Sequence, residues 1–145
     1  MKSRMIRDRA AYSMTFWAIF IGLVMIPLMA LSIEVGRFLF ARTQIAAAAD
    51  AAALAAAVEI NERLYVNTGI LAPTSKTYQW AQRAVNANCE ELIELDVYPG
   101  VGGILVVGNT VRVSVSADLG LMFPSIVPDI KVTEWGTAEV RALHD

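Results

Sequence analysis

The chain has 145 residues, 56% of them hydrophobic, and a formal net charge of −2, so it has room for one small globular domain beside a long helix. The net acidity excludes the basic footprint that nucleic-acid-binding proteins need, and we expect no nucleic acid among the partners. The single cysteine, Cys89, excludes an internal disulfide. We expect it to be a buried thiol, with an intermolecular bridge as the alternative.

The charge is distributed unevenly along the chain. Residues 1–9 carry a net charge of +3, whereas the remainder carries −5. A basic tip in front of an apolar run is typical of a segment that stays in the cytoplasm. The pattern therefore predicts a single-pass protein of the inner (cytoplasmic) membrane, with the N-terminus inside and the C-terminus outside.

An uncharged run, residues 10–33, follows the basic tip. It is longer than the roughly 20 residues that a spanning helix needs, and we expect a membrane anchor. A cleaved signal peptide is the alternative, with Ala30–Ser32 as a candidate cleavage site, although the apolar core of a signal peptide is only about 7–15 residues long. Pro27 lacks an amide hydrogen and is expected to kink the helix near Leu23.

The helical pattern continues without a turn signal from Arg9 to Ile60. At about 1.5 Å per residue this helix is roughly 75–80 Å long, whereas the hydrocarbon core of a bilayer takes up about 30 Å. The remainder is expected to project from the membrane as a stalk. Glu34 and Arg37 lie three residues apart on one helix face and can pair where the apolar run ends. The alternative is that Glu34 pairs with a basic group on a neighbouring subunit.

Alanine dominates the far end of this helix, where ten of the twelve residues from Ala46 to Ala57 are alanine. Alanine has the highest helix propensity, and small residues let helix backbones approach closely. We therefore expect a contact surface between helices of different subunits, on which a leucine would clash and prevent assembly. Asp50, the one charge in the run, would be either solvated or paired. The expected contact face contains Ala48, Ala52 and Ala55.

The most specific sequence signal lies in residues 33–57, which read IEVGRFLFARTQIAAAADAAALAAA. This segment resembles the N-terminal motif of TadE/TadG-like proteins of the Tad (Flp) pilus system. The chain has Glu34 where the family often has Asp, lacks the Gly-to-acidic spacing of prepilin-peptidase sites near residues 10–16, and is too short for the adhesion-type domain of larger members. The resemblance implies a pilin-like, membrane-inserted pilus component, either a filament subunit or an assembly component. By position, the motif falls on Glu34, Gly36, Arg37, Gln44, Ala49, Asp50 and Leu54.

Beyond the helix the sequence is typical of a small α+β domain. A weak apolar stripe predicts a helix from Lys76 to Asn88, and alternating side chains predict antiparallel strands after it. Gly108-Asn109 suits a two-residue hairpin turn. The expected fold is a pilin-like α+β fold, with a membrane-spanning and stalk helix (residues 1–66) and an extracytoplasmic head (67–145) of one helix and three or four strands. We expect the head to fold on its own from about Thr68. The predicted strands cover residues 93–98, 104–107, 110–117 and 130–141, with an apolar loop at 119–129.

No group of residues predicts catalysis. The single histidine, His144, is the penultimate residue, and neither Ser114 nor Ser116 has a histidine nearby in the sequence to activate it. Clustered His and Cys ligands for zinc are missing. The acidic residues between Glu90 and Asp96 are better explained as solvated charges than as calcium ligands. We therefore expect no enzyme activity, no cofactor, no metal site and no small-molecule substrate.

These features predict a structural subunit or assembly component, pilin-like or pseudopilin-like, of a bacterial surface pilus. The N-terminal helix would anchor in the membrane and pack in the filament core against copies of the chain or other pilus proteins. The chain would then lie in the inner membrane, in an extracellular filament, or in both. One alternative is a resident single-pass envelope anchor whose head binds pilus or other envelope proteins. Secretion after cleavage near Ser32 and a membrane-tethered enzyme are further alternatives.

Overall fold

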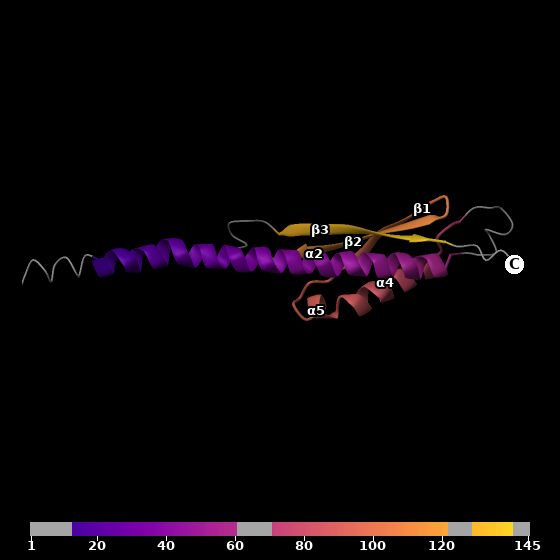
Figure 1. The fold of residues 1–145 in the computed structure, drawn as a ribbon. Helices are drawn as coiled ribbons and strands as arrows, with labels where there is room; N and C mark the ends of the chain where they lie inside the picture. Colours follow the sequence, from indigo (N-terminus) through magenta and orange to yellow (C-terminus); the bar gives the residue numbers. More distant parts are fainter. Residues whose placement is uncertain (1–12, 61–70, 122–128, 141–145) are drawn as a thin grey trace, which may run out of the picture. The chain divides into compact units, whose positions relative to one another are not determined.

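The computed structural model describes residues 13–60, 71–121 and 129–140 of the chain (Figure 1). Contacts divide the chain into two compact units, Met1–Arg37 and Phe38–Asp145. The first unit is helical throughout its described part, and the second contains a three-stranded antiparallel sheet, which confirms the predicted fold class. The elements are η1 (Ile21–Met25), α2 (Ile26–Val58), α4 (Ser75–Asn88), α5 (Glu90–Ile93), β1 (Gly100–Val107), β2 (Thr110–Leu119) and β3 (Ile130–Glu139).

The helix of the first unit changes its hydrogen-bond pattern just before Pro27. Residues 13–20 are α-helical, η1 is π-helical, and the amide of Ile26 donates to the carbonyl of Ile21, five residues back. Proline cannot donate to the carbonyl four residues before it, and π-helical turns are one way in which a helix absorbs such an interruption. The irregular stretch includes Leu23, around which the sequence predicted a disturbance; the kink itself stays a prediction.

The second unit begins within α2, so the alanine-rich half of this helix belongs to the same compact unit as the sheet. Alanine favours the helical conformation and adds almost no side-chain bulk, so one face of the helix can lie close to its neighbours. The predicted boundary between residues 66 and 67 falls outside the described residues. The buried residues of α2 are Ala41, Ile45, Ala48, Ala49, Ala52, Ala53 and Ala56.

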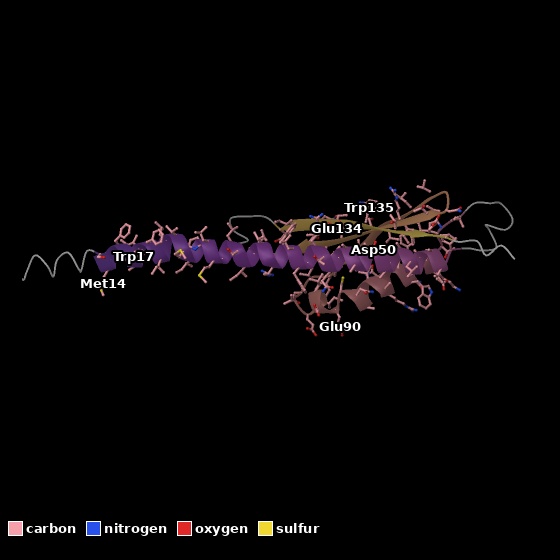
Figure 2. The ribbon with its side chains drawn as sticks, viewed as in Figure 1. Met14, Trp17, Asp50, Glu90, Glu134 and Trp135 are labelled. Carbon is pink, nitrogen blue, oxygen red and sulfur yellow. The ribbon has the colours of Figure 1, made fainter. Side chains whose placement is uncertain are left out.

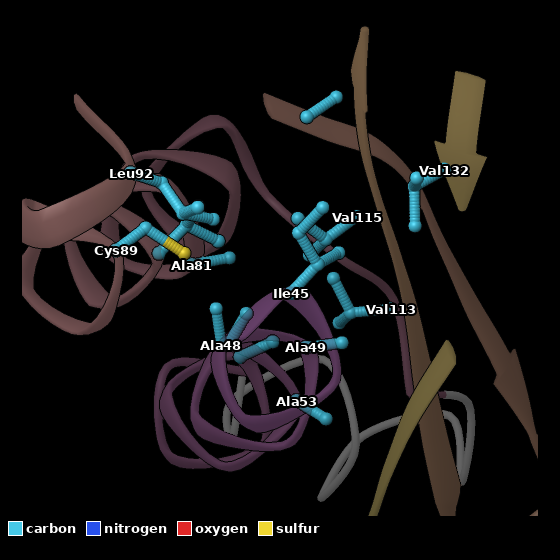
Figure 3. Packing of buried hydrophobic residues seen from close by; sticks show 14 of the residues in the cluster. Ile45, Ala48, Ala49, Ala53, Ala81, Cys89, Leu92, Val113, Val115 and Val132 are labelled. Carbon is cyan, nitrogen blue, oxygen red and sulfur yellow. The ribbon is translucent and has the colours of Figure 1, made fainter. Parts of the chain in front are cut away.

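The hydrophobic core of the second unit lies between the sheet and the helices that cover one of its faces (Figure 3). Ile45 of α2 points toward Val113 and Val115 of β2, whereas Ala48 lies on the side of Ala81 and Cys89. All six of these residues are buried. The core therefore combines small residues from α2 with branched residues from β2, and α2 supplies part of the cover that the sheet needs.

Helix α4 begins at a capping box that the sequence analysis did not identify. The amide of Thr77 donates to Thr74 Oγ1 at 3.3 Å, and the amide of Thr74 donates to Thr77 Oγ1 at 2.9 Å. Two amides that would otherwise lack partners are thereby satisfied. The predicted helix from Lys76 to Asn88 is confirmed, with its start one residue earlier.

The three strands follow one another in the order β1-β2-β3, and both pairs are antiparallel. The predicted hairpin turn is present, because β1 ends at Val107 and β2 begins at Thr110. Gly108 has a φ of +60°, which a glycine adopts without steric cost. Val111, Val113 and Val115 face the core as predicted, although Ser114 between the last two is also buried.

The strand predicted for residues 93–98 is wrong. The chain instead forms the short helix α5 and a turn, in which the amide of Val97 donates to the carbonyl of Leu92 at 2.9 Å. Leu92 and Val97 enter the core while Leu95 stays exposed. Asp96 takes a positive φ of 58°, a conformation that Asp tolerates better than most residues. The strand that does form, β1, begins at Gly100, four residues before its predicted start.

Candidate assembly and membrane-contact surfaces

The first unit presents large apolar side chains on its surface. One helix among the described residues, Ser13–Val58, is long and apolar enough to cross a membrane by length and composition, and none of its most apolar window is buried. Met14 and Trp17 project from it in Figure 2. Trp17 packs edge-on against Phe20, with ring centroids 5.8 Å apart. Exposed apolar surface of this extent is what a bilayer or other helices would cover.

The pair predicted at the end of the apolar run is present. Arg37 Nη1 lies 3.5 Å from Glu34 Oε2, and the Glu34 side chain is the more buried of the two. A methyl group added at Gly36 would meet nothing within 4 Å, so this glycine is not required by any close contact inside the chain. The alternative, that Glu34 pairs with a neighbouring subunit, stays a prediction.

The structure places the predicted contact face of the alanine run against the chain's own head. Ala48 and Ala52 are fully buried in the core, and Ala55 is half-buried. The closest approach is at Gly136 of β3, where an added Cβ would overlap the carbonyl of Ala49. Small residues do allow close approach here, but the observed partner is a strand of the same chain. Contacts of these alanines with other subunits stay a prediction.

The opposite face of α2 is the one that the head leaves uncovered. Asp50, Leu54 and Val58 lie on it, spaced four residues apart, and all are exposed. Asp50 makes no hydrogen bond or ion pair with the described part of the chain, so the solvated alternative describes it in the single chain. The side chain of Leu54 is 63% exposed and that of Val58 is 77% exposed. Exposed aliphatic side chains at this spacing form a stripe that another helix could cover.

Polar contacts fasten α2 to the rest of the second unit. Arg42 Nε donates to Glu134 Oε1 of β3 at 2.6 Å, and Gln44 Nε2 donates to Glu91 Oε2 of α5 at 3.3 Å. The sequence analysis placed Gln44 on the family motif without a role, and it did not identify Arg42. A local pattern could not reveal either contact, because the partners lie 92 and 47 residues away along the chain.

Cys89 lies in the core beside the motif residue Gln44. Its Sγ is 3.9 Å from the backbone carbonyl of Gln44, and the residue has no exposed surface. Burial raises the pKa of the Cys89 thiol above its ordinary value, because the thiolate would lose its hydration. A neutral, buried thiol of this kind is unreactive. The predicted buried thiol is confirmed.

The acidic side chains on and after α5 do not form a metal centre. Within residues 13–60, 71–121 and 129–140, no group of three His, Cys, Asp or Glu side chains lies close enough to hold a metal ion. Glu90 and Glu91 occupy the first turn of α5, and Glu91 accepts the hydrogen bond from Gln44. His144 lies outside the described residues.

Comparison with known proteins identifies the segment that carries the helix. No curated protein and no solved structure matches the chain. Residues 13–59 match a family described as putative Flp pilus-assembly TadE/G-like. The matched segment contains the apolar helix, the Glu34–Arg37 pair and the alanine run, and the match confirms the resemblance of this part of the chain to TadE/TadG-like proteins of the Tad pilus system.

Proposed function

We propose that the chain is a structural subunit or assembly component of a bacterial Tad (Flp) pilus, anchored in the inner membrane by its N-terminal helix. The family match over residues 13–59 and the exposed apolar helix within them support this proposal. The N-terminus lies in the cytoplasm and the head lies outside it, in the orientation that the basic tip favours. The role is structural and needs no catalytic group, cofactor or metal.

The uncovered stripe of α2 is the observation that carries the proposal. The face containing Ala48 and Ala52 is already buried within the chain's own second unit, so other subunits contact the face with Leu54 and Val58. These exposed aliphatic side chains lose hydration when another copy of the helix covers them, which favours association by about 25 cal/mol per Å² of apolar surface. Asp50 on the same face fixes which partners fit, because a buried carboxylate needs a basic group opposite it.

Substitution of Leu54 by Glu tests this proposal. The side chain is exposed, so the head of Leu54→Glu is expected to fold and the chain to insert, while pili are lost because a second charge enters the contact. The matched control is Leu95→Glu, which makes the same change at a 57% exposed site in the turn after α5. Pili are counted by electron microscopy, and mass spectrometry of purified pili measures the amount of this chain. Normal pili from Leu54→Glu would contradict a contact through this stripe.

A second candidate function is a resident envelope anchor that binds pilus or other envelope proteins through its head. The outer face of the sheet favours it. Trp135 of β3 is exposed there (Figure 2), and so are Leu105 and Val107 of β1 by strand register. The composition of purified pili separates the two candidates. A filament subunit is the dominant protein of the pilus, whereas an anchor stays in the membrane fraction when pili are sheared off.

The proposed orientation is tested separately with a reporter enzyme fused after Asp145. The reporter is chosen to be active only outside the cytoplasm, and activity is expected. A matched fusion that is active only inside the cytoplasm serves as the control, and activity of that second fusion would reverse the proposed orientation.

A further inference from the structure

We infer that the end of the head at which β3 begins rests on the lipid headgroups of the membrane that holds the N-terminal helix. The surface consists of Leu39 and Phe40 on α2 and Ile130 at the start of β3, all three exposed. We call it the basal surface. The inference rests on the membrane anchoring proposed above and adds a partner, the phospholipid surface, for a part of the head.

Two contacts fix the direction of β3 relative to the helix within the second unit. Glu134 is hydrogen-bonded to Arg42, and two residues further along the strand Gly136 meets Ala49. Strand and helix therefore run in the same direction. Going back from Glu134 to Ile130 covers about 13 Å of strand and leads toward the end of the helix that begins at Phe38. The strand start and the residues following Phe38 thus share one end of the unit.

Covalent connection places this end close to the bilayer. The apolar run ends at Ile33, and only four residues lie between it and Phe38. The helical rise from Ile33 to Phe38 is about 8 Å. The headgroup layer on each side of the hydrocarbon core is about 5–8 Å thick. The basal surface is therefore at the depth of the headgroups or immediately above them, where the exposed ring of Phe40 is favoured.

The charges around the basal surface exclude an electrostatic attachment. Lys131 is exposed, but it pairs in register with Asp118 on β2, and the exposed Asp129 precedes β3. On the helix side, Arg37 pairs with Glu34 and Arg42 pairs with Glu134. Four carboxylates against three basic groups give no attraction to anionic lipid. The contact is therefore made by apolar side chains, and salt is not expected to release it.

Tryptophan fluorescence in vesicles tests the inference on the full chain. All three native tryptophans are replaced by Phe (Trp17→Phe, Trp80→Phe and Trp135→Phe), and Ile130→Trp is added. The protein is reconstituted in phosphatidylcholine vesicles that carry a nitroxide quencher at the headgroup level. The matched control is Val107→Trp, an exposed aliphatic site at the opposite end of the sheet, since Val107 pairs with Thr110 while Ile130 pairs with Leu119.

We expect headgroup quenching of Ile130→Trp to exceed that of Val107→Trp at least twofold, and to persist in 0.5 M NaCl. Equal quenching of the two variants, or its loss in salt, would overturn the inference. If headgroup quenching of Ile130→Trp falls as the protein-to-lipid ratio rises, another copy of the chain covers the surface instead. That result would also overturn the inference. If Ile130→Trp does not fold, Lys131→Trp at the neighbouring exposed position carries the same test.

A further variant separates failure of this inference from failure of the anchoring. It keeps Trp17 as its only tryptophan and is measured with a quencher on the acyl chain. Strong quenching of Trp17 together with none of Ile130→Trp means that the chain is anchored and its head stands clear of the lipid. Without quenching of Trp17, both the anchoring and the contact of the basal surface are rejected.

Discussion

Helix α2 is apolar on both sides of the unit boundary at residue 37, but the two halves differ in what covers them. Leu28, Met29 and Leu31 in the first half are exposed in the single chain, whereas Ala48 and Ala52 in the second half are fully buried. The difference lies in side-chain size. Large apolar side chains suit a solvent of lipid tails or neighbouring helices, and small ones suit a backbone that lies against a strand. Side-chain volume therefore distinguishes two environments that hydrophobicity alone does not.

The largest expected effect comes from removing the alanine-rich half. A fragment from Thr68 lacks the buried residues of α2, so Val113 and Val115 lose part of their cover and the fragment is expected to remain unfolded. A fragment from Phe38 keeps them and is expected to fold. Thermal unfolding followed by circular dichroism measures both. A cooperative transition in the shorter fragment would show that the head folds without the alanine face, as the sequence analysis expected.

The next largest effect is expected at the closest point between helix and strand. In Gly136→Ala the added methyl group overlaps the backbone of Ala49, and a rigid backbone cannot move aside as a side chain can. We expect the free energy of unfolding to fall by about 3 kcal/mol, the upper part of the range for overpacking. Gly100→Ala is the control, because its methyl group meets nothing within 4 Å. Denaturant titration of the fragment from Phe38 compares the two, and equal midpoints would show that helix and strand do not approach as described.

A leucine in the alanine face is expected to lower the stability of the head, whatever its effect on assembly. Ala52→Leu inserts three carbon atoms at a fully buried site, which costs about 1–3 kcal/mol. Leu54→Ala on the exposed stripe is expected to change head stability by less than about 0.5 kcal/mol. Denaturant titration of both variants measures the contrast. If the head of Ala52→Leu is as stable as that of the unchanged chain, the result would favour the predicted role of this face in contacts between subunits.

The smallest effect is expected from the ion pair that fastens α2 to β3. The Arg42 side chain is 58% exposed, so water screens its interaction with Glu134. Arg42→Ala is expected to lower the free energy of unfolding by about 0.2–1 kcal/mol, and by less at high salt. Lys76→Ala, at an exposed basic residue for which no ion pair is found among the described residues, provides the control. A loss above about 2 kcal/mol would mean that the pair is far less hydrated than its exposure indicates.

Local patterns were sufficient for the elements whose signals are contained in a short window. Val111, Val113 and Val115 alternate on one side of a strand, and Gly108 supplies the turn before it, so β2 and its hairpin follow from the sequence. The strand predicted for residues 93–98 is wrong because the alternation of Ile93, Leu95 and Val97 fits a helical turn followed by a loop as well as it fits a strand. What decides is that Leu92 and Val97 reach the core, which depends on tertiary contacts.

The partner of the alanine run could not be predicted for a related reason. Alanine permits another backbone to approach closely but does not specify which one. Either a helix or a strand can pack against an alanine face. The complementary signal is Gly136, a glycine in the middle of a strand, where it weakens the strand unless another backbone comes close. Reading the two segments together would have suggested their contact, although they lie 87 residues apart from Ala49 to Gly136.

The contact between Ala49 and Gly136 also has a consequence for biosynthesis. A ribosome makes α2 long before β3, and chains fold from the N-terminus as they emerge. Until Gly136 has been synthesised, the face of α2 that it covers has no strand against it. Alanine makes this delay tolerable, because a methyl group exposes far less apolar area than a leucine side chain would. The alanine run can therefore be helical and exposed to water before β3, which later covers it, has been made.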